Sequence, residues 1–296
     1  MIQDNSQVPY ESPVVPNLLN QDDTIQFNCH KGISCFNACC KQADITLAPY
    51  DVIRLKNHLG ISSTEFLKKH TVPFQMDASG MPGIKLRTTD EEPVCLFVTN
   101  EGCSVYEDRP SACRYYPVGL MALRKKDSPT EEHNYCLVEE PHCKGHQEDR
   151  KLTIAQYRQE QGVEIYDDMN REWYQIILKK RSSGPSIGTP TPTSFQFFFL
   201  CSYDIDRFRQ FINTDSFKST YDLPADEFAA LDDDVALLKF GYRLMKQVLF
   251  GEESIPLREG ALEERIEKRR EIIEARKQLE IELHKQKQDP YQAGDC

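Results

Sequence analysis

Apolar positions recur at helical spacing over several parts of the chain. Residues 48–60 carry an apolar stripe that ends at Gly60, which predicts a helix with a glycine cap. Residues 62–70 open with serine and threonine and place an acidic side chain in the first turn, which predicts a second helix. Residues 153–162 and 163–181 are expected to form two more helices, the latter ending in a Lys/Arg cluster that suits a helix C-terminus.

The pattern changes after residue 182. Residues 182–194 are rich in Ser, Thr, Gly and Pro and are expected to form a linker. The apolar run at 195–204 predicts a buried strand, and residues 204–212 and 226–250 predict helices. Residues 257–288 are dense in charge and do not sustain a heptad, so a solvated helix is favoured over a partner-binding helix.

Further short strands are expected in the first half. Residues 83–88 and 94–98 alternate or cluster like strands, with a hairpin turn before Cys103. Pro110 is expected to begin a short helical turn. The predicted fold class is α+β: a small cysteine-rich metal-binding domain with short strands and helices, then a mostly helical domain and a long charged C-terminal helix. The predicted divisions are an extended arm at 1–24, a cysteine-cluster domain at 25–181, a helical extension at 195–256 and a charged helical tail at 257–296.

Composition narrows the class of partner. The net charge is −11, which argues against nucleic acid or an anionic membrane as the main partner. The first twenty residues lack the basic and apolar regions of a signal peptide, and the most apolar run is too short to cross a bilayer. We therefore expect a cytoplasmic protein, whose thiols would stay reduced.

The cysteines carry the candidate chemistry, because nine of the eleven lie in the first half of the chain. A thiolate is a ligand for zinc, copper(I) or an iron–sulfur cluster, so this half is interpreted as a scaffold for one or two metal centres. Buried thiols or a disulfide set are the alternatives. The candidate ligands are Cys29, Cys35, Cys39, Cys40, Cys95, Cys103, Cys113, Cys136 and Cys143; Cys201 and Cys296 are expected to be spare.

Details of the spacing lead to further expectations. Cys39 and Cys40 are adjacent, and neighbouring side chains in an extended segment point opposite ways, so the two are not expected to share one ion. Asp108 is expected to cap the turn that Pro110 begins. Arg109 and Arg114 either donate hydrogen bonds toward thiolates or pair with acids. Four histidines near the cysteines are minor candidates as ligands: His30, His133, His142 and His146.

The second cysteine block resembles the CxxCxxCC family of zinc- or iron-chelating proteins, also called YkgJ-like. That family carries C-x₇-C-x-x-Y-x-x-RP-x-x-C-R-x-x-P, and the matching positions are Cys95, Cys103, Tyr106, Arg109, Pro110, Cys113, Arg114 and Pro117. The first block, CHKGISCFNACC, has longer gaps than CxxCxxCC but keeps its ending, and Cys143 resembles the late cysteine of the family. The resemblance implies a bound iron–sulfur cluster or zinc, and for some members lysine N-methylation of flagellin.

Two functions follow as hypotheses. In the favoured one, the protein binds an iron–sulfur cluster, and any enzyme activity would be redox chemistry or protein lysine N-methylation. No motif supports a site for S-adenosylmethionine, and no nucleotide-binding fingerprint is present. In the alternative, the protein is a non-catalytic zinc-binding structural or interaction module. A protein substrate or partner would bind through the C-terminal helix, and neither nucleic acid nor membrane is expected.

Overall fold

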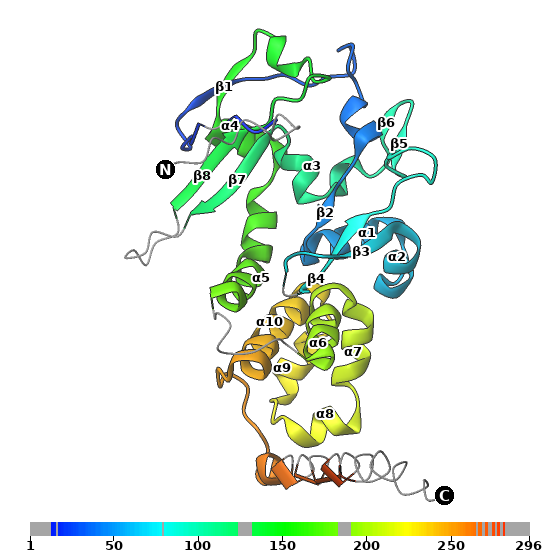
Figure 1. Cartoon of the computed structure of the whole chain (residues 1–296), viewed down its shortest axis with the longest axis vertical. Coiled ribbons are helices and arrows are strands. Elements are labelled where there is room, and N and C mark those ends of the chain that lie inside the picture. The colour runs from blue at the N-terminus through cyan, green and yellow to red at the C-terminus, as the bar shows by residue number, and fades with distance from the viewer. Residues whose placement is uncertain are drawn as a thin grey trace, which may run out of the picture.

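The computed structural model is an α+β protein in which short strands and several helices share the chain (Figure 1). It describes residues 13–123 other than 16 and 79, residues 132–182 and 191–264, and scattered positions from 266 to 281. Parts of three predicted segments therefore lie outside the described residues. These are residues 1–12 of the arm, residues 183–190 of the linker, and the end of the tail with Cys296.

Two antiparallel strand pairs build the first layer. β1 pairs with β9, and β7 pairs with β8; the bounds are β1 Thr24–Gln26, β9 Lys151–Thr153, β7 Val118–Leu123 and β8 Glu132–Leu137. Helix α4, Ile154–Gln161, follows β9 directly and ends at Gly162 in the left-handed region. Together they enclose a small apolar cluster, here called the β-hairpin core: Ile25, Phe27, Tyr115, Val118, Tyr135, Leu152, Ile154, Tyr157 and Val163.

The predicted arm is tied to this layer where it is described. Val14 and Leu19 form isolated antiparallel bridges with Val138 and Tyr135 of the β8 region. Backbone bonds of 2.8 Å run in both directions between Leu19 and Tyr135. The described part of the arm therefore pairs with the β8 region of the hairpin at these two points.

A three-stranded sheet and two helices lie next along the chain. The sheet has the order β2–β4–β3, with β2 at Thr46–Leu47, β3 at Thr71–Gln75 and β4 at Pro82–Leu86. Helix α1 spans Pro49–Leu59 and ends at Gly60 with a φ of 65°, which confirms the predicted glycine cap. Helix α2 spans Ser63–His70, and the Ser62 hydroxyl accepts a hydrogen bond from the Glu65 backbone, which confirms the predicted start.

Small elements connect these layers to the cysteine segments. They are the 3₁₀ turns η1 Ala38–Gln42, η2 Tyr106–Asp108 and η3 Gly145–Gln147, the hairpin strands β5 Val98–Thr99 and β6 Gly102–Cys103, and helix α3 Ser111–Tyr115. The hairpin and the short helix confirm the predicted turns around Cys103 and Pro110.

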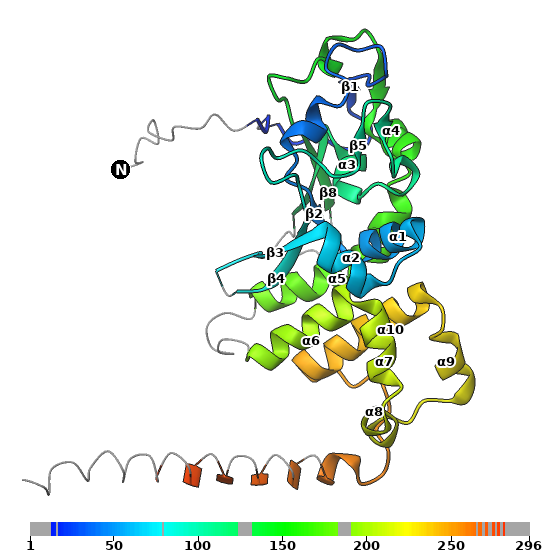
Figure 2. The same ribbon diagram turned by 90° about the vertical axis from the view of Figure 1, so that its right-hand side faces the viewer.

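The rest of the described chain is helical. Helix α5, Glu164–Ser182, descends from the β-hairpin core to the helices below (Figures 1 and 2). These are α6 Pro192–Tyr203, α7 Ile205–Ile212, α8 Asp215–Thr220, α9 Ala225–Ala230 and α10 Asp234–Phe250. Their apolar faces meet those of α1, α2 and the three-stranded sheet in one large cluster that extends from Leu47 to Ile255, here called the helical core.

Two predictions in this half are wrong. The apolar run at 195–204 is a helix, because Thr191 accepts a hydrogen bond from the Ser194 backbone and Pro192 occupies the first turn. α6 contacts α10, α7 and β4, so it can be apolar on several sides without helical periodicity. The single helix predicted at 226–250 is divided, because Asp233 accepts a hydrogen bond from Ala236 and begins α10 anew.

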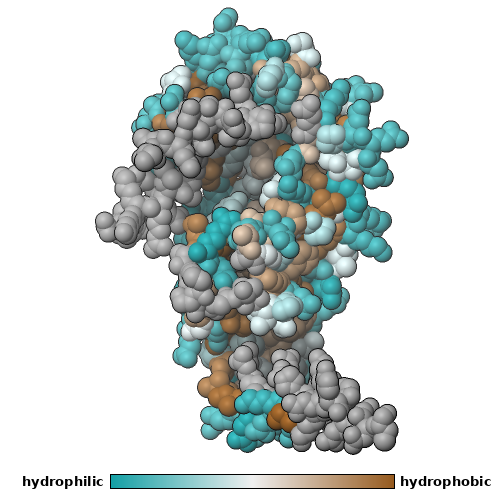
Figure 3. Space-filling model, viewed as in Figure 1, coloured by the Kyte–Doolittle hydropathy of each residue, from teal (hydrophilic) through white to brown (hydrophobic). Residues whose placement is uncertain are grey.

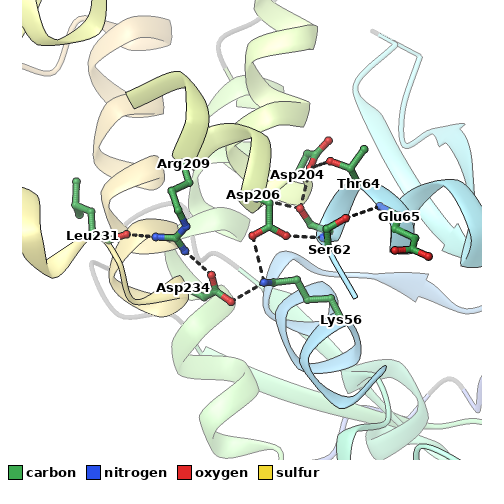
Figure 4. A network of polar contacts seen from close by, with 10 residues as sticks. Lys56, Ser62, Thr64, Glu65, Asp204, Asp206, Arg209, Leu231 and Asp234 are labelled. Atoms are coloured by element: carbon green, nitrogen blue, oxygen red, sulfur yellow. Dashed lines mark hydrogen bonds and ion pairs between the residues drawn. The ribbon is translucent and has the colours of Figure 1, made fainter. Parts of the chain in front are cut away.

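A polar network crosses from the first half to the C-terminal helices. The Lys56 ammonium on α1 is buried and lies 3.4 Å from Asp206 and 2.8 Å from Asp234 (Figure 4). Arg209 donates to Asp234 at 2.5 Å, and the Ser63 backbone donates to Asp206 at 2.6 Å. The helical core thus includes residues of both the predicted cysteine-cluster domain and the predicted helical extension.

The surface is largely polar. Hydrophilic residues cover most of the described upper part of the face in Figure 3, and hydrophobic residues form small groups. The described positions between 261 and 281 are helical, and Leu262 and Ile266 are exposed there. No helix in the described ranges has the length and apolar character needed to cross a bilayer.

Candidate metal centre

Eight of the nine candidate cysteines line one cavity of about 720 Å³. They come from turns and short elements far apart in sequence. The cavity cysteines are Cys29, Cys35, Cys39, Cys40, Cys95, Cys103, Cys113 and Cys143. The cavity also touches both apolar clusters, since Phe27 and Tyr157 of the β-hairpin core and Phe97 and Val105 of the helical core contribute to its wall.

Backbone contacts hold the first two cysteine groups together. The Cys95 amide donates to the Cys40 carbonyl at 2.8 Å. Asn37 adopts a left-handed conformation just before η1, and its side-chain amide donates to the Thr99 carbonyl at 3.0 Å. The turn that carries Cys40 is therefore fixed against the hairpin that carries Cys103.

The late cysteine is brought to the same cavity by the segment around η3. The Asn28 amide donates to the Gly145 carbonyl at 3.1 Å, and the Lys144 amide donates to the Cys35 sulfur at 3.2 Å. Gly145 is needed for this approach, because a Cβ there would lie 2.4 Å from the Phe27 ring. Cys143 is thereby placed beside the first cysteine group.

The adjacent pair differs from the expected extended conformation. Cys39 and Cys40 lie in the 3₁₀ turn η1, not in an extended segment, and their sulfurs are 4.0 Å apart. Two thiolates bound to one tetrahedral zinc ion at 2.3 Å would be separated by about 3.8 Å. The pair is therefore close enough to share a centre or to serve two adjacent ones.

The thiols influence each other electrostatically. Interaction with the neighbouring Cys40 thiol lowers the pKa of Cys39 to about 7, against the opposing effect of burial. Burial, together with the thiolates of Cys39, Cys35 and Cys143, raises the pKa of Cys29 to about 11. Crowded sulfurs of this kind resist deprotonation together unless a cation compensates their charge.

Cys136 does not reach the cavity. It is buried on β8, and its thiol donates to the Gly119 carbonyl at 3.7 Å. Cys201, expected to be spare, is buried in α6 within the helical core. Each of these two thiols packs as a small apolar side chain would.

Residues 28–144 match the sequence model of the CxxCxxCC family, described as "Putative zinc- or iron-chelating domain". This segment belongs to that family. The match covers less than half of the chain and includes all eight cavity cysteines. Neither the curated proteins nor the solved structures contain a match to this chain. The CxxCxxCC description supports a bound metal and is equally compatible with zinc and iron.

The donor set of the CxxCxxCC domain fits such a metal, since eight soft thiols face one cavity. Within the described residues, no three His, Cys, Asp or Glu side chains lie close enough to hold an ion as they are. Binding would therefore require cysteine side chains to rotate between their staggered χ1 positions.

The turn before Cys113 is capped by a residue that the sequence did not indicate. Asp51 of α1 is fully buried, and its carboxylate accepts from the Ser111 amide at 2.8 Å and from the Ser111 hydroxyl at 3.0 Å. It also accepts from the Ala48 amide at 2.8 Å. Burial raises the pKa of Asp51 to about 6, although these hydrogen bonds oppose the shift. Asp51 thus joins the start of α1 to the helix that carries Cys113.

Asp108 was expected to cap that turn and does not. It accepts instead from Arg54 at 2.8 Å and lies 2.7 Å from the His58 ring nitrogen, both on α1. The N-terminus of α3 has no side-chain cap at the position of Pro110. Asp108 therefore joins η2 to α1 through its contacts with Arg54 and His58.

Arg109 and Arg114 were expected either to donate hydrogen bonds toward thiolates or to pair with acids, and their main hydrogen bonds go to backbone carbonyls instead. Arg114 donates to the carbonyls of Arg109 at 3.1 Å and Gln161 at 2.7 Å, and its guanidinium lies over the Tyr166 ring at 4.5 Å. Arg109 donates to the Tyr106 carbonyl at 2.7 Å and also lines the cavity. Burial raises the pKa of Cys103, and the charge of Arg109 opposes that rise. Both arginines thus hold the loop, and Arg109 adds a positive charge to the cavity wall.

Two of the candidate histidines line the cavity. They are His30, which lies 3.1 Å from Glu148, and His142, which lies 3.5 Å from Glu140. The His146 ring instead packs against Phe27 with centroids 5.2 Å apart. The side chain of His133 is outside the described residues.

Sequence reasoning missed the aromatic wall of the cavity. Phe36, Phe97, Tyr116 and Tyr157 line it together with Phe27. Four of these five lie within three residues of a cavity cysteine, so proximity to the cysteines is a signal that could have found them. Tyr157 comes from α4 and could not have been found in that way.

Proposed function

We propose that the CxxCxxCC domain binds an iron–sulfur cluster through the thiols of its cavity. The observation that carries the proposal is that eight cysteines from separate elements line one space. Thiolate ligands held on turns and short elements are the usual way to bind such clusters.

The size of the cavity supports a polyatomic group over a single ion. A zinc ion with four thiolates at 2.3 Å needs almost no space beyond its ligands. The cavity here is about 720 Å³. A cluster occupies more of such a space and leaves room beside it for a substrate group. When bound, a cluster supplies one-electron chemistry and an electrophilic iron.

The activity proposed for such a site is redox chemistry or protein lysine N-methylation. The cavity has an aromatic wall and the acidic side chains of Glu101 and Glu140, which suit a cationic lysine side chain from a protein substrate. S-adenosylmethionine would be the methyl donor, and no motif supports its site. The exposed C-terminal helix, with Leu262 and Ile266, is the proposed contact for a protein partner.

A cytoplasmic location is part of the same proposal. The ten described cysteines are free, including the adjacent Cys39 and Cys40. Thiols of this kind stay reduced in a cytoplasm and would be oxidised outside it. Fractionation of cells that produce the tagged chain tests this, and recovery in a secreted or periplasmic fraction would contradict it.

A structural zinc site is the second candidate, and one observation favours it. The Cys39 and Cys40 sulfurs are 4.0 Å apart, close to the separation of about 3.8 Å expected for two thiolates on one tetrahedral zinc. In that case the domain would be a non-catalytic structural or interaction module.

The test is elemental analysis and optical spectroscopy of protein purified without oxygen. Iron and acid-labile sulfide with a broad visible band that bleaches on reduction are expected. Cys103→Ser should reduce iron and sulfide, while Cys136→Ser, the matched control outside the cavity, should leave both unchanged. Colourless protein with stoichiometric zinc would support the structural module, and metal-free wild type would refute both candidates.

A further inference from the structure

The cavity thiols fall into two groups by the backbone contacts of the segments that carry them. Cys29, Cys35 and Cys143 form the first group. The Lys144 amide donates to the Cys35 sulfur at 3.2 Å, and the Asn28 amide donates to the Gly145 carbonyl at 3.1 Å. These contacts draw the segments before Cys29 and after Cys143 together.

Cys95, Cys103 and Cys113 form the second group. Cys95 and Cys103 flank one hairpin, in which Val98 pairs with Cys103 and the Val98 amide donates to the Cys95 carbonyl at 3.2 Å. Cys113 lies on α3 and lines the same cavity. The Cys95 amide donates to the Cys40 carbonyl at 2.8 Å, so η1 adjoins this group directly.

Each group of three lacks one thiol of the four that a tetrahedral ion or a cubane cluster takes. The adjacent cysteines of η1 supply two, and their sulfurs are 4.0 Å apart. The Cys40 carbonyl accepts from the Cys95 amide of the second group, which leaves Cys39 to complete the first.

We infer that the cavity holds two adjacent four-thiolate centres, one bound by Cys29, Cys35, Cys39 and Cys143 and the other by Cys40, Cys95, Cys103 and Cys113. This inference rests on the proposed function and adds to it the number of centres and the division of ligands. The adjacent cysteines are the point at which the two centres meet, and Cys136 belongs to neither.

The test is titration of the apo protein with Co²⁺ under reducing, oxygen-free conditions. Cobalt takes tetrahedral thiolate sites in place of zinc, and its thiolate charge-transfer absorbance counts the bound ions whatever the native metal is. We expect two equivalents for wild type and for Cys136→Ser. Cys143→Ser and Cys113→Ser should each bind one equivalent, and the double variant none. Far-ultraviolet circular dichroism checks that each variant keeps its helices.

Double variants that include one of the adjacent cysteines, Cys39 or Cys40, discriminate best in this titration. Cys39→Ser combined with Cys143→Ser should keep one equivalent, because both changes fall on the same centre. Cys39→Ser combined with Cys113→Ser should keep none, because each removes a different centre. When Cys40→Ser takes the place of Cys39→Ser in these double variants, the two results should be reversed.

The outcomes separate this inference from the proposed function. One equivalent in wild type, lost in both single variants, would show a single shared centre and overturn the division while leaving metal binding intact. Two equivalents with the pairings of Cys39 and Cys40 exchanged would also overturn the division. No cobalt and no native metal in wild type would refute the metal centre itself.

Discussion

The helical core and the β-hairpin core differ in what holds them together. The helical core gathers buried side chains from the sheet and from α1, α2, α5, α6, α7, α8 and α10, and α9 packs against it through the partly buried Phe228. The β-hairpin core has nine buried residues, and the cysteine segments beside it are turns and strands of two or three residues. Apolar burial can stabilise the first by itself, whereas the second region needs a further source of free energy.

Removal of metal should change the stability of the cysteine region relative to the helical core more than any other treatment. Binding of a structural metal by thiolates contributes about 10–16 kcal/mol of apparent folding free energy in small domains. Chelation under reducing conditions should therefore expose the amides of residues 28–45 and 95–116 to hydrogen exchange and leave α6, α7 and α10 protected. Mass spectrometry of exchanged peptides measures both regions in one sample. Equal loss of protection in both would show that the two regions fold as one unit.

Phe208→Ala tests the other side of the comparison. Phe208 is fully buried on α7, stacked against Phe211 and Phe240, and its truncation should cost about 3–5 kcal/mol. We expect a lower midpoint in denaturant with the metal content of the folded protein unchanged. Phe211→Ala, at a partly buried position on the same helix, is the matched control and should cost less. A loss of metal from folded Phe208→Ala would show that the stabilities of the two regions are coupled.

Lys56→Met should lower the free energy of unfolding by less, about 1–3 kcal/mol. In this variant Asp234 still accepts a hydrogen bond from Arg209, and Asp206 still accepts one from the Ser63 amide. Burial alone would raise the pKa of Asp206, but the Ser63 amide and the Lys56 ammonium together hold it below its usual value of 3.8. This contribution to stability is present above pH 3.8 and is lost as the pH falls through the depressed pKa. Lys56→Met should therefore flatten the acid side of the stability profile. An unchanged acid limb in urea melts between pH 2 and pH 5, with Lys69→Met as an exposed control, would contradict this.

Removal of the tail should have the smallest effect. Truncation after residue 260 keeps the bridge between Tyr221 and Leu257 and the 3.0 Å bond from the Arg258 amide to the Thr220 carbonyl. Metal content should stay unchanged, and stability should change by about 0.5 kcal/mol or less. Truncation after residue 256 removes both contacts and serves as the contrasting variant. Metal analysis and thermal melts of the two truncations check this, and loss of metal in the longer one would contradict it.

Local signals in the sequence predicted much of the fold. Gly60, Ser62 and Pro110 mark element ends that depend only on neighbouring residues, and these ends were predicted correctly. The cysteine pattern also predicted which residues gather, with the exception of Cys136. Both kinds of signal are short-range or compositional, so they survive without knowledge of the tertiary fold.

The errors have a common physical cause, which is contact between distant segments. The run that forms α6 is apolar on several sides because α10, α7 and β4 surround it, and no local periodicity records that. Asp51 caps a helix 60 residues away, so the nearer Asp108 looked like the better candidate. The 4.0 Å separation of Cys39 and Cys40 depends on a 3₁₀ turn that Asn37 and its partner Thr99 fix in place.

The chain has one tryptophan, Trp173, whose position makes it an intrinsic fluorescent probe. Trp173 is 2% exposed on α5, and its indole nitrogen donates to the Ser202 hydroxyl of α6 at 3.0 Å. Its fluorescence therefore reports on the packing of the helical core, from a dry site that should give blue-shifted emission. The native protein thus contains an optical probe inside the helical core, and a chromophore bound in the cavity would act on it as an energy acceptor.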